Sequence, residues 1–183
     1  MSHGPAEPDG IVVRPAERAD LLSVVRIERT SFPQPWPYEA CVGFLGEPGF
    51  LVAVDARDES VQADPVGADG GGATAARRVE AGPIVGYVVA DVTATHGGDV
   101  GHVKDVAVAP ERRGEGIGAS LLSNALATMA AANADSVTLE VRASNEGAQR
   151  LYRRFGFEPL RRVRDYYADG EDALVLLRGL GRE

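Results

Sequence analysis

The chain has 183 residues, which is enough for one domain to bury a hydrophobic core without disulfides or a structural metal. Its 27 acidic and 19 basic side chains give a formal net charge of −8, which argues against general nucleic-acid binding because that binding depends on neutralising phosphates. A single cysteine, Cys41, excludes an internal disulfide framework, and together with only three histidines it argues against a Cys/His zinc site.

The sequence predicts neither a membrane segment nor a secretory leader. Every apolar run is shorter than the roughly 20 residues of a membrane-spanning helix. The N-terminal sequence MSHGPAEPDG lacks the basic and apolar segments of a signal peptide. We therefore expect a cytoplasmic protein with no membrane partner. Lys104 is the one lysine among the 19 basic residues, and the acidic excess fits either a GC-rich coding bias or adaptation to a salty cytoplasm.

The first part of the chain predicts a strand, two helices and a second strand. Apolar residues recur at helical spacing after Asp20, and the three prolines of FPQPWP at 32–37 cannot lie inside a helix. The expected elements are a disordered tail at 1–10, a strand at 11–14, helices at 18–31 and about 38–46, and a strand at 50–54.

A flexible insertion is expected at about 55–82. This stretch is rich in Gly, Ala and Asp, includes GADGGGATAA, and shows no amphipathic period. Loops of this length are either functional or disordered, and the composition favours disorder.

Regular patterns return after the insertion. The glycines at 97–98 predict a turn between two strands that pair as an antiparallel hairpin, and Gly156 stands where a helix would end. The expected elements are strands at 84–92 and 101–110, a helix at 117–132, a strand at 136–141, a helix at 146–155, and strands at 157–163 and 172–180. The order β-α-α-β-β-β-α-β-α-β-β predicts a single mixed α/β domain over 11–180.

A glycine-rich turn between a strand and a helix carries the strongest functional signal. In VAPERRGEGIGASLL, residues 108–122, the strand is followed by three glycines and then by a helix. Glycines let the backbone approach an anion closely, and the helix N-terminus offers unpaired N–H groups. Arg112 and Arg113 add positive charge, so the segment suits a pyrophosphate. The alternative is a glycine-rich turn without a ligand.

The spacing Arg113-x-x-Gly116-x-Gly118 after VAVAP resembles the GNAT superfamily of acyl-CoA-dependent N-acyltransferases, over about residues 11–180 without the insertion. The resemblance implies a central, twisted, mostly antiparallel sheet of about seven strands flanked by about four helices. It implies that acetyl-CoA is the co-substrate and that no metal is used. The residues it assigns to acetyl-CoA are Val106, Ala107, Val108, Arg112, Arg113, Gly114, Gly116, Gly118, Ala119 and Asn145. Of these, Asn145 has the alternative role of a helix N-cap.

The segments LEVRASNEGAQRLYRRFGFEP (139–159) and RDYYADGEDALVL (164–176) are similar to the ribosomal-protein-alanine (RimI-like) branch and to archaeal and eukaryotic protein N-terminal acetyltransferases. An α-amino group has a pKa of about 8 and must lose a proton before it attacks a thioester. The resemblance makes Glu140 the general base, Tyr152 the acid for the departing thiolate, and His102 a proton relay. The alternatives are a solvated strand face for Glu140, a core position for Tyr152 and a structural role for His102.

The acceptor groove is assigned by the same resemblance to the loop between the first two helices and the loop before the last strand. Gln34 stands where NatA-like enzymes often have an acidic residue, so Ala, Ser or Thr as the first acceptor residue is only an initial expectation. Phe32 and Trp36 have the alternative role of a hydrophobic plug. The assigned substrate-binding residues are Phe32, Pro33, Trp36, Tyr166 and Tyr167.

Three functions remain open on the sequence. The favoured one is acetylation of protein or peptide N-termini, with ribosomal proteins among the candidate substrates. The second is acetylation of a small-molecule amine or a lysine side chain, and the third is a non-catalytic acyl-CoA-binding partner protein. We expect a monomer or weak dimer with no nucleic-acid partner.

Overall fold

The structure is a computed structural model that describes residues 8–57 and 82–181. Most of the expected tail at 1–10 and of the expected insertion at 55–82 lies outside the described residues, so both remain predictions. Among the helices in the described ranges, none combines the length and the apolar character that crossing a bilayer requires.

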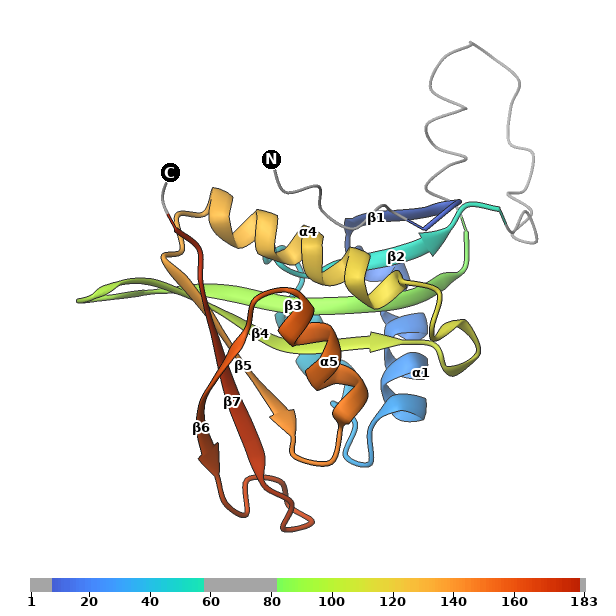
Figure 1. Cartoon of the computed structure of the whole chain (residues 1–183). Coiled ribbons are helices and arrows are strands. Elements are labelled where there is room, and N and C mark those ends of the chain that lie inside the picture. The colour runs from blue at the N-terminus through green and yellow to red at the C-terminus, as the bar shows by residue number, and fades with distance from the viewer. Residues whose placement is uncertain (1–7, 58–81, 182–183) are drawn as a thin grey trace, which may run out of the picture.

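A seven-stranded sheet forms the centre of the fold, in the order β1-β2-β3-β4-β5-β7-β6 (Figure 1). Every neighbouring pair is antiparallel except β4 and β5, which run parallel. This confirms the predicted mostly antiparallel sheet and the predicted β3–β4 hairpin. The strands are β1 (Ile11–Pro15), β2 (Leu51–Asp55), β3 (Ile84–Thr95), β4 (Gly98–Val108), β5 (Ser136–Arg142), β6 (Glu158–Val163) and β7 (Ala173–Gly179).

Two helices cover each face of the sheet, and the predicted order of elements is confirmed (Figure 1). The first predicted helix begins with a 3-10 turn, because the side chain of Asp20 accepts a hydrogen bond from Glu17 N at 2.8 Å and caps the turn. The helices are α1 (Leu21–Ser31), α2 (Tyr38–Gly43), α4 (Ile117–Ala131) and α5 (Glu146–Arg154), with 3-10 turns at Arg18–Asp20 and Pro110–Arg112.

The sheet separates two hydrophobic clusters. On one face, α4 buries Leu121 and Leu122 completely against the sheet. On the other face, α1 buries Leu21 and Val24 completely, and Phe50 joins them. Because each fully buried side chain of this size contributes about 1.5–3 kcal/mol, the two clusters hold the helices firmly on the sheet.

Strands β4 and β5 pair over only four residues and then diverge, as Figure 1 shows. The paired residues run from Val100 and Ser136 to Val103 and Leu139. We call the place where they separate the splay. Beyond it, the edge of β4 that faces β5 has no ladder partner among the described residues, which leaves its peptide groups available to a ligand.

A β-bulge shapes β4 at the same level. Val89 pairs with Asp105, but the next residue, Ala90, pairs with Val103, so Lys104 is an extra residue in β4. A bulge of this kind puts two consecutive side chains on one face of the strand. Lys104 and Asp105 therefore both lie on the α1 face of the sheet, where Lys104 contacts Asp91 at 2.9 Å.

Candidate active site

Glu140 and His102 form a hydrogen-bonded pair at the splay. The two side chains come from neighbouring parallel strands, and Nε2 of His102 lies 2.6 Å from Oε2 of Glu140. Since a carboxylate has no proton, the histidine N–H donates. Val137, Leu139 and Val141 of β5 are buried on the opposite face, so alternation directs Glu140 to the α1 face. The Glu140 side chain is 23% exposed, which leaves a carboxylate that a substrate can reach.

Tyr152 of α5 lies on the other side of the sheet, in the core beneath α4. It is 8% exposed and packs edge-to-face against Phe157, with 5.9 Å between the ring centroids. Burial raises the pKa of Tyr152. The phenol therefore stays protonated over the whole range in which proteins work, as a proton donor must.

Tyr166 and Tyr167, in the loop between β6 and β7, approach the same carboxylate. Burial raises the pKa of Tyr166, and the charge of Glu140 raises it further. The pKa of Tyr167 is raised to about 12, mainly by burial. Arg142 holds this loop: its guanidinium stacks on the Tyr167 ring at 3.9 Å and pairs with Glu171 at 2.7 Å. The structure thus brings both predicted tyrosines to the neighbourhood of Glu140.

The 32–37 loop follows α1 and lies over the α1-face cluster. Phe32 ends α1, and Pro33 is exposed in the loop. Trp36 is half-buried and stacks on Phe44 of the α2–β2 connection, with 5.3 Å between the ring centroids. Phe32 and Trp36 pack against the core, so part of each side chain closes the hydrophobic cluster, as the alternative role of a plug predicts.

The glycine-rich loop, residues 113–118, has the backbone that an anion site requires. Gly114 and Gly116 have φ angles of +83° and +86°, which side-chain-bearing residues rarely adopt. Around Gly114, no described atom lies within 4 Å of where a Cβ would stand, so the surface above it is open. The helix α4 begins at Ile117, and the N–H groups of its first turn, including those of Gly118 and Ala119, have no helical acceptor. These residues fit an acetyl-CoA pyrophosphate.

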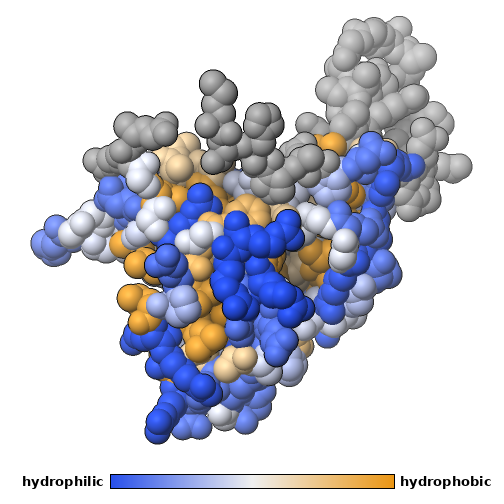
Figure 2. All heavy atoms as spheres, in the orientation of Figure 1, coloured by the Kyte–Doolittle hydropathy of each residue, from blue (hydrophilic) through white to orange (hydrophobic). Residues whose placement is uncertain are grey.

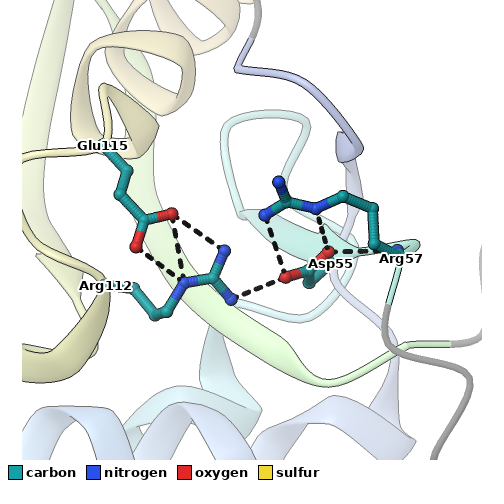
Figure 3. Close-up of polar contacts among 4 residues, drawn as sticks. All are labelled: Asp55, Arg57, Arg112 and Glu115. Atoms are coloured by element: carbon teal, nitrogen blue, oxygen red, sulfur yellow. Dashed lines mark hydrogen bonds and ion pairs between the residues drawn. The ribbon is translucent and has the colours of Figure 1, made fainter.

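Arg112 is engaged by two carboxylates, as Figure 3 shows. Its Nη1 lies 2.6 Å from Asp55, and its Nη2 lies 2.9 Å from Glu115. Arg57 completes the cluster by pairing with Asp55 at 3.1 Å. Two positive and two negative charges therefore meet beside the glycine-rich loop. In this arrangement Arg112 braces the loop against β2, and its assignment to the phosphates remains a prediction.

Arg113 is also tied to the protein. Its Nε donates to the carbonyl of Val108 at 3.1 Å, and its Nη2 donates to Ser31 Oγ at 3.2 Å. These bonds link the loop to the end of β4 and to the end of α1. Val106 and Ala107 pair with β3 along one edge, while their other edge faces the splay.

Asn145 acts as the N-cap of α5. Its Oδ1 accepts a hydrogen bond from Ala148 N at 3.1 Å, so the capping role left open by the sequence is confirmed. A contact of Asn145 with acetyl-CoA remains a prediction.

Several residues at the site were not identified from the sequence. Glu28, Tyr87 and Asp105 form a buried polar cluster beneath the 32–37 loop. The sequence does carry a signal for this cluster: Glu28 lies on the apolar stripe of a helix, and Asp105 lies within the apolar strand VKDVAV. The role of Arg142 is signalled only by its place at the end of a core strand.

Taken together, the site combines a reachable carboxylate paired with a histidine, a buried phenol kept protonated, and a glycine-rich anion cradle. The carboxylate can accept a proton from a nucleophile, and the phenol can supply one to a leaving group. The cradle and the unpaired edge of β4 can hold a long anionic co-substrate.

Comparison with known proteins gives a consistent result. The model of the acetyltransferase (GNAT) family matches residues 24–157. An N-alpha-acetyltransferase of Sulfolobus acidocaldarius is 31% identical over 173 residues, which is 90% of this chain and 89% of that protein. A putative [ribosomal protein bS18]-alanine N-acetyltransferase of Bacillus subtilis is 39% identical over 79 residues, which is 43% of this chain and 52% of that protein. The crystal structure of Ard1 from Thermoplasma volcanium has the same fold, with a TM-score of 0.75 and 24% identity over 94% of this chain and 99% of that chain.

Proposed function

Because the chain belongs to the GNAT family and is an acetyl-CoA-dependent N-acetyltransferase, we propose that it acetylates the N-terminal α-amino group of proteins or peptides. The relatives that match it over about nine tenths of both chains carry the name N-alpha-acetyltransferase. The observation that carries the proposal is the pairing of Glu140 with His102 on the α1 face, beside the two tyrosines of the β6–β7 loop.

Glu140 acts as the general base. It accepts a proton from the α-ammonium group, directly or through one water, so that the neutral amine can attack the thioester. The donor bond from His102 at 2.6 Å fixes the carboxylate in place. His102 is 34% exposed, and in the tautomer that carries its proton on Nδ1, its Nε2 can accept the proton from Glu140 while Nδ1 releases one toward solvent.

Tyr152 acts as the acid. Its phenol supplies a proton to the sulfur as the thiolate leaves, which favours breakdown of the thioester. The raised pKa of Tyr152 ensures that this proton is present at neutral pH. The residue lies on α5, in the core on the α4 face of the sheet.

The glycine-rich loop and β4 hold the co-substrate. Gly114, Gly116 and the first turn of α4 would bind the pyrophosphate, and the free edge of β4 would pair with the pantetheine arm. Acetyl-CoA supplies the acetyl group as a thioester. The 32–37 loop, Tyr166 and Tyr167 then wall the entry of the acceptor, and small first residues such as Ala, Ser or Thr suit these walls.

The test is a transfer assay with acetyl-CoA and four peptides, beginning with Ala, Ser, Met or N-acetyl-Ala and otherwise identical, each with an internal lysine. We expect CoA release with free N-termini and none with the acetylated one. Release with the blocked peptide or with a polyamine, and none with a free N-terminus, would contradict the proposal.

Glu140→Gln tests the base in the same assay. We expect kcat to fall about 10²–10⁴-fold, since a general base contributes that much, while the KM for acetyl-CoA stays within twofold. Glu158→Gln, on the exposed strand β6, is the matched control and should leave kcat unchanged. Full activity of Glu140→Gln would remove Glu140 from the mechanism.

A further inference from the structure

A buried acid beneath the 32–37 loop has no arginine partner among the residues that the structure describes. Glu28 of α1 is 1% exposed. Two other buried acids, Asp20 and Asp55, each pair with at least one arginine. The recorded bonds of Glu28 are instead with a backbone N–H and a phenol: Trp36 N donates to its Oε1 at 2.7 Å, and the Tyr87 hydroxyl donates to its Oε2. A carboxylate that is buried in this way satisfies two donors that approach it from different elements.

The Tyr87 hydroxyl joins Glu28 to a second carboxyl group, that of Asp105, at 3.0 Å. A phenol has one proton and cannot donate it to two carboxylates at once. The second contact is therefore made by a proton on a carboxyl group. Burial and the charge of Glu28 raise the pKa of Asp105, which favours its protonated form and agrees with this arrangement.

The cluster connects two parts of the site that are far apart in sequence. One end is the backbone of the 32–37 loop, through Trp36. The other end is Asp105, which the bulge in β4 turns toward the α1 face next to the splay. The hydrogen-bonded path from Trp36 to Asp105 thus spans from the acceptor wall to the strand that would hold acetyl-CoA.

We infer that Glu28 is a positioning residue for the acceptor peptide: through Trp36 N–H it fixes the 32–37 loop at the distance from β4 that the peptide requires. This inference rests on the proposed function. Three prolines stiffen the loop, so its position is set mainly where it is tied down. Glu28 makes that tie from α1, and Tyr87 and Asp105 hold the Glu28 carboxylate to the sheet.

The variants Glu28→Met and Glu28→Gln separate this role from packing. Both replacements have nearly the volume of Glu, but Met accepts neither bond, whereas Gln keeps an oxygen for Trp36 N–H. We expect Glu28→Met to raise the KM for the peptide about tenfold, as the loss of one hydrogen bond predicts, with the KM for acetyl-CoA within twofold. Glu28→Gln should restore most of the affinity for the peptide.

Trp36 is the only tryptophan in the chain, so its fluorescence reports on this loop alone. In Glu28→Met we expect stronger quenching by acrylamide than in the wild type, and in Glu28→Gln nearly wild-type quenching. Asp20→Asn is the matched control, because it alters a buried acid at the start of α1, away from the loop. It should lower stability and leave both the KM for the peptide and the quenching unchanged.

The outcomes distinguish the inference from the function on which it rests. If the wild type acetylates no free N-terminus, the proposed function fails, and unchanged quenching in Glu28→Met would then overturn the loop tie as well. If the wild type is active but Glu28→Met keeps its KM for the peptide, the inference is wrong. Should Glu28→Met not fold, Tyr87→Phe removes the phenol that steadies Glu28, and an unchanged KM for the peptide in that variant would also overturn it.

Discussion

Glu140 and Tyr152 occupy opposite environments, and each environment suits the role proposed for the residue. Glu140 lies on a partly exposed strand face with a histidine donor. Tyr152 lies in the core, where burial raises its pKa. A base needs access to a substrate proton, whereas an acid must keep its own proton until the leaving group develops charge. The two side chains lie on opposite faces of the sheet, so in the proposed mechanism the reacting groups would meet between them.

Tyr152→Phe should therefore lower kcat while leaving the fold intact. The substitution removes one oxygen and keeps the edge-to-face contact with Phe157. We expect kcat to fall about 10²-fold, because a positioned acid contributes at least that much. Steady-state kinetics with an Ala-initiated peptide measure the change.

Tyr38→Phe is the control for Tyr152→Phe. Tyr38 is a half-buried tyrosine of α2 that packs against the cluster on the α1 face. Removing its hydroxyl should leave kcat unchanged. Equal kcat values for both variants and the wild type would exclude Tyr152 as the acid.

At the scale of elements, the backbone conformation of the glycine-rich loop is better evidence for an anion site than its charged side chains are. Gly116 is the N-cap of α4 and has a left-handed conformation, so both the loop and the helix start depend on it. The adjacent Arg112 is neutralised by Asp55 and Glu115. Under the proposed function, binding of phosphate at this loop would therefore depend on N–H groups and on the helix N-terminus, while Arg112 holds the loop in place.

Gly116→Ala should weaken acetyl-CoA binding more than it weakens the fold. At φ +86° an alanine is strained by about 1 kcal/mol. In the proposed complex its methyl group would also stand where the backbone approaches the phosphates. We expect the KM for acetyl-CoA to rise about tenfold or more, with the KM for the peptide little changed. Initial-rate kinetics with each substrate varied in turn measure both values.

Gly46→Ala matches this strain at another place. Gly46 has a φ of +92° in the connection after α2, and no described atom lies within 4 Å of where its Cβ would stand. This variant should lose similar stability in urea but keep the wild-type KM for acetyl-CoA. A similar rise of that KM in both variants would show that strain, and not obstruction, is responsible.

The order of elements was predictable because each one has a strong local pattern. Val137, Leu139 and Val141 alternate along β5, and Gly156 ends the turn after α5. The bulge at Lys104 was not predictable, since it depends on the register between β3 and β4. The cluster of Glu28, Tyr87 and Asp105 was missed for the same reason: its members are far apart in sequence and meet only after the sheet and α1 have packed.

The candidate site was predictable to a similar degree. The resemblance of short motifs located Glu140, His102 and the two tyrosines of the β6–β7 loop, and the structure brings them together. It could not show that Arg112 is held by Asp55, because that contact joins residues 57 positions apart. Ion pairs between distant elements leave no local pattern in a sequence.

At the scale of the whole molecule, the net charge of −8 is not shared by the surface around the glycine-rich loop. The four charges of Figure 3 balance there, so the acidic excess lies elsewhere. Figure 2 shows hydrophilic side chains over much of the visible face, with hydrophobic patches between them. Among the ion pairs, that of Asp55 with Arg112 is partly shielded from water, so it contributes more to stability than an exposed pair would.

Asp55→Asn should change how stability depends on pH. Hydrogen bonds from Arg57 and the charge of Arg112 lower the pKa of Asp55 to about 2. A lowered pKa contributes stability above the ordinary value near 4, and this contribution is lost as the pH falls from about 4 toward 2. We expect the variant to lose roughly 1–2 kcal/mol of unfolding free energy at pH 7 and to have a flatter profile in acid.

Urea unfolding at a series of pH values measures this effect. Glu115→Gln is the matched control because it removes the other carboxylate that contacts Arg112, at the exposed side of the cluster. It should cost less stability than Asp55→Asn. Parallel profiles of the wild type and Asp55→Asn between pH 4 and pH 3 would contradict the role given to Asp55.

The short pairing between β4 and β5 has a consequence for how ligand binding should affect stability. Among the described residues, four residue pairs make up all of the strand pairing between the β1–β4 half of the sheet and the β5–β7 half. Because few backbone hydrogen bonds join the two halves, their contact depends largely on the hydrophobic cluster on the α4 face, which spans both. In the proposed complex, a co-substrate lying between β4 and β5 would replace the missing backbone hydrogen bonds. Since such a ligand would bind only the folded protein, the thermal midpoint should rise with acetyl-CoA concentration, and the size of the rise would report the affinity.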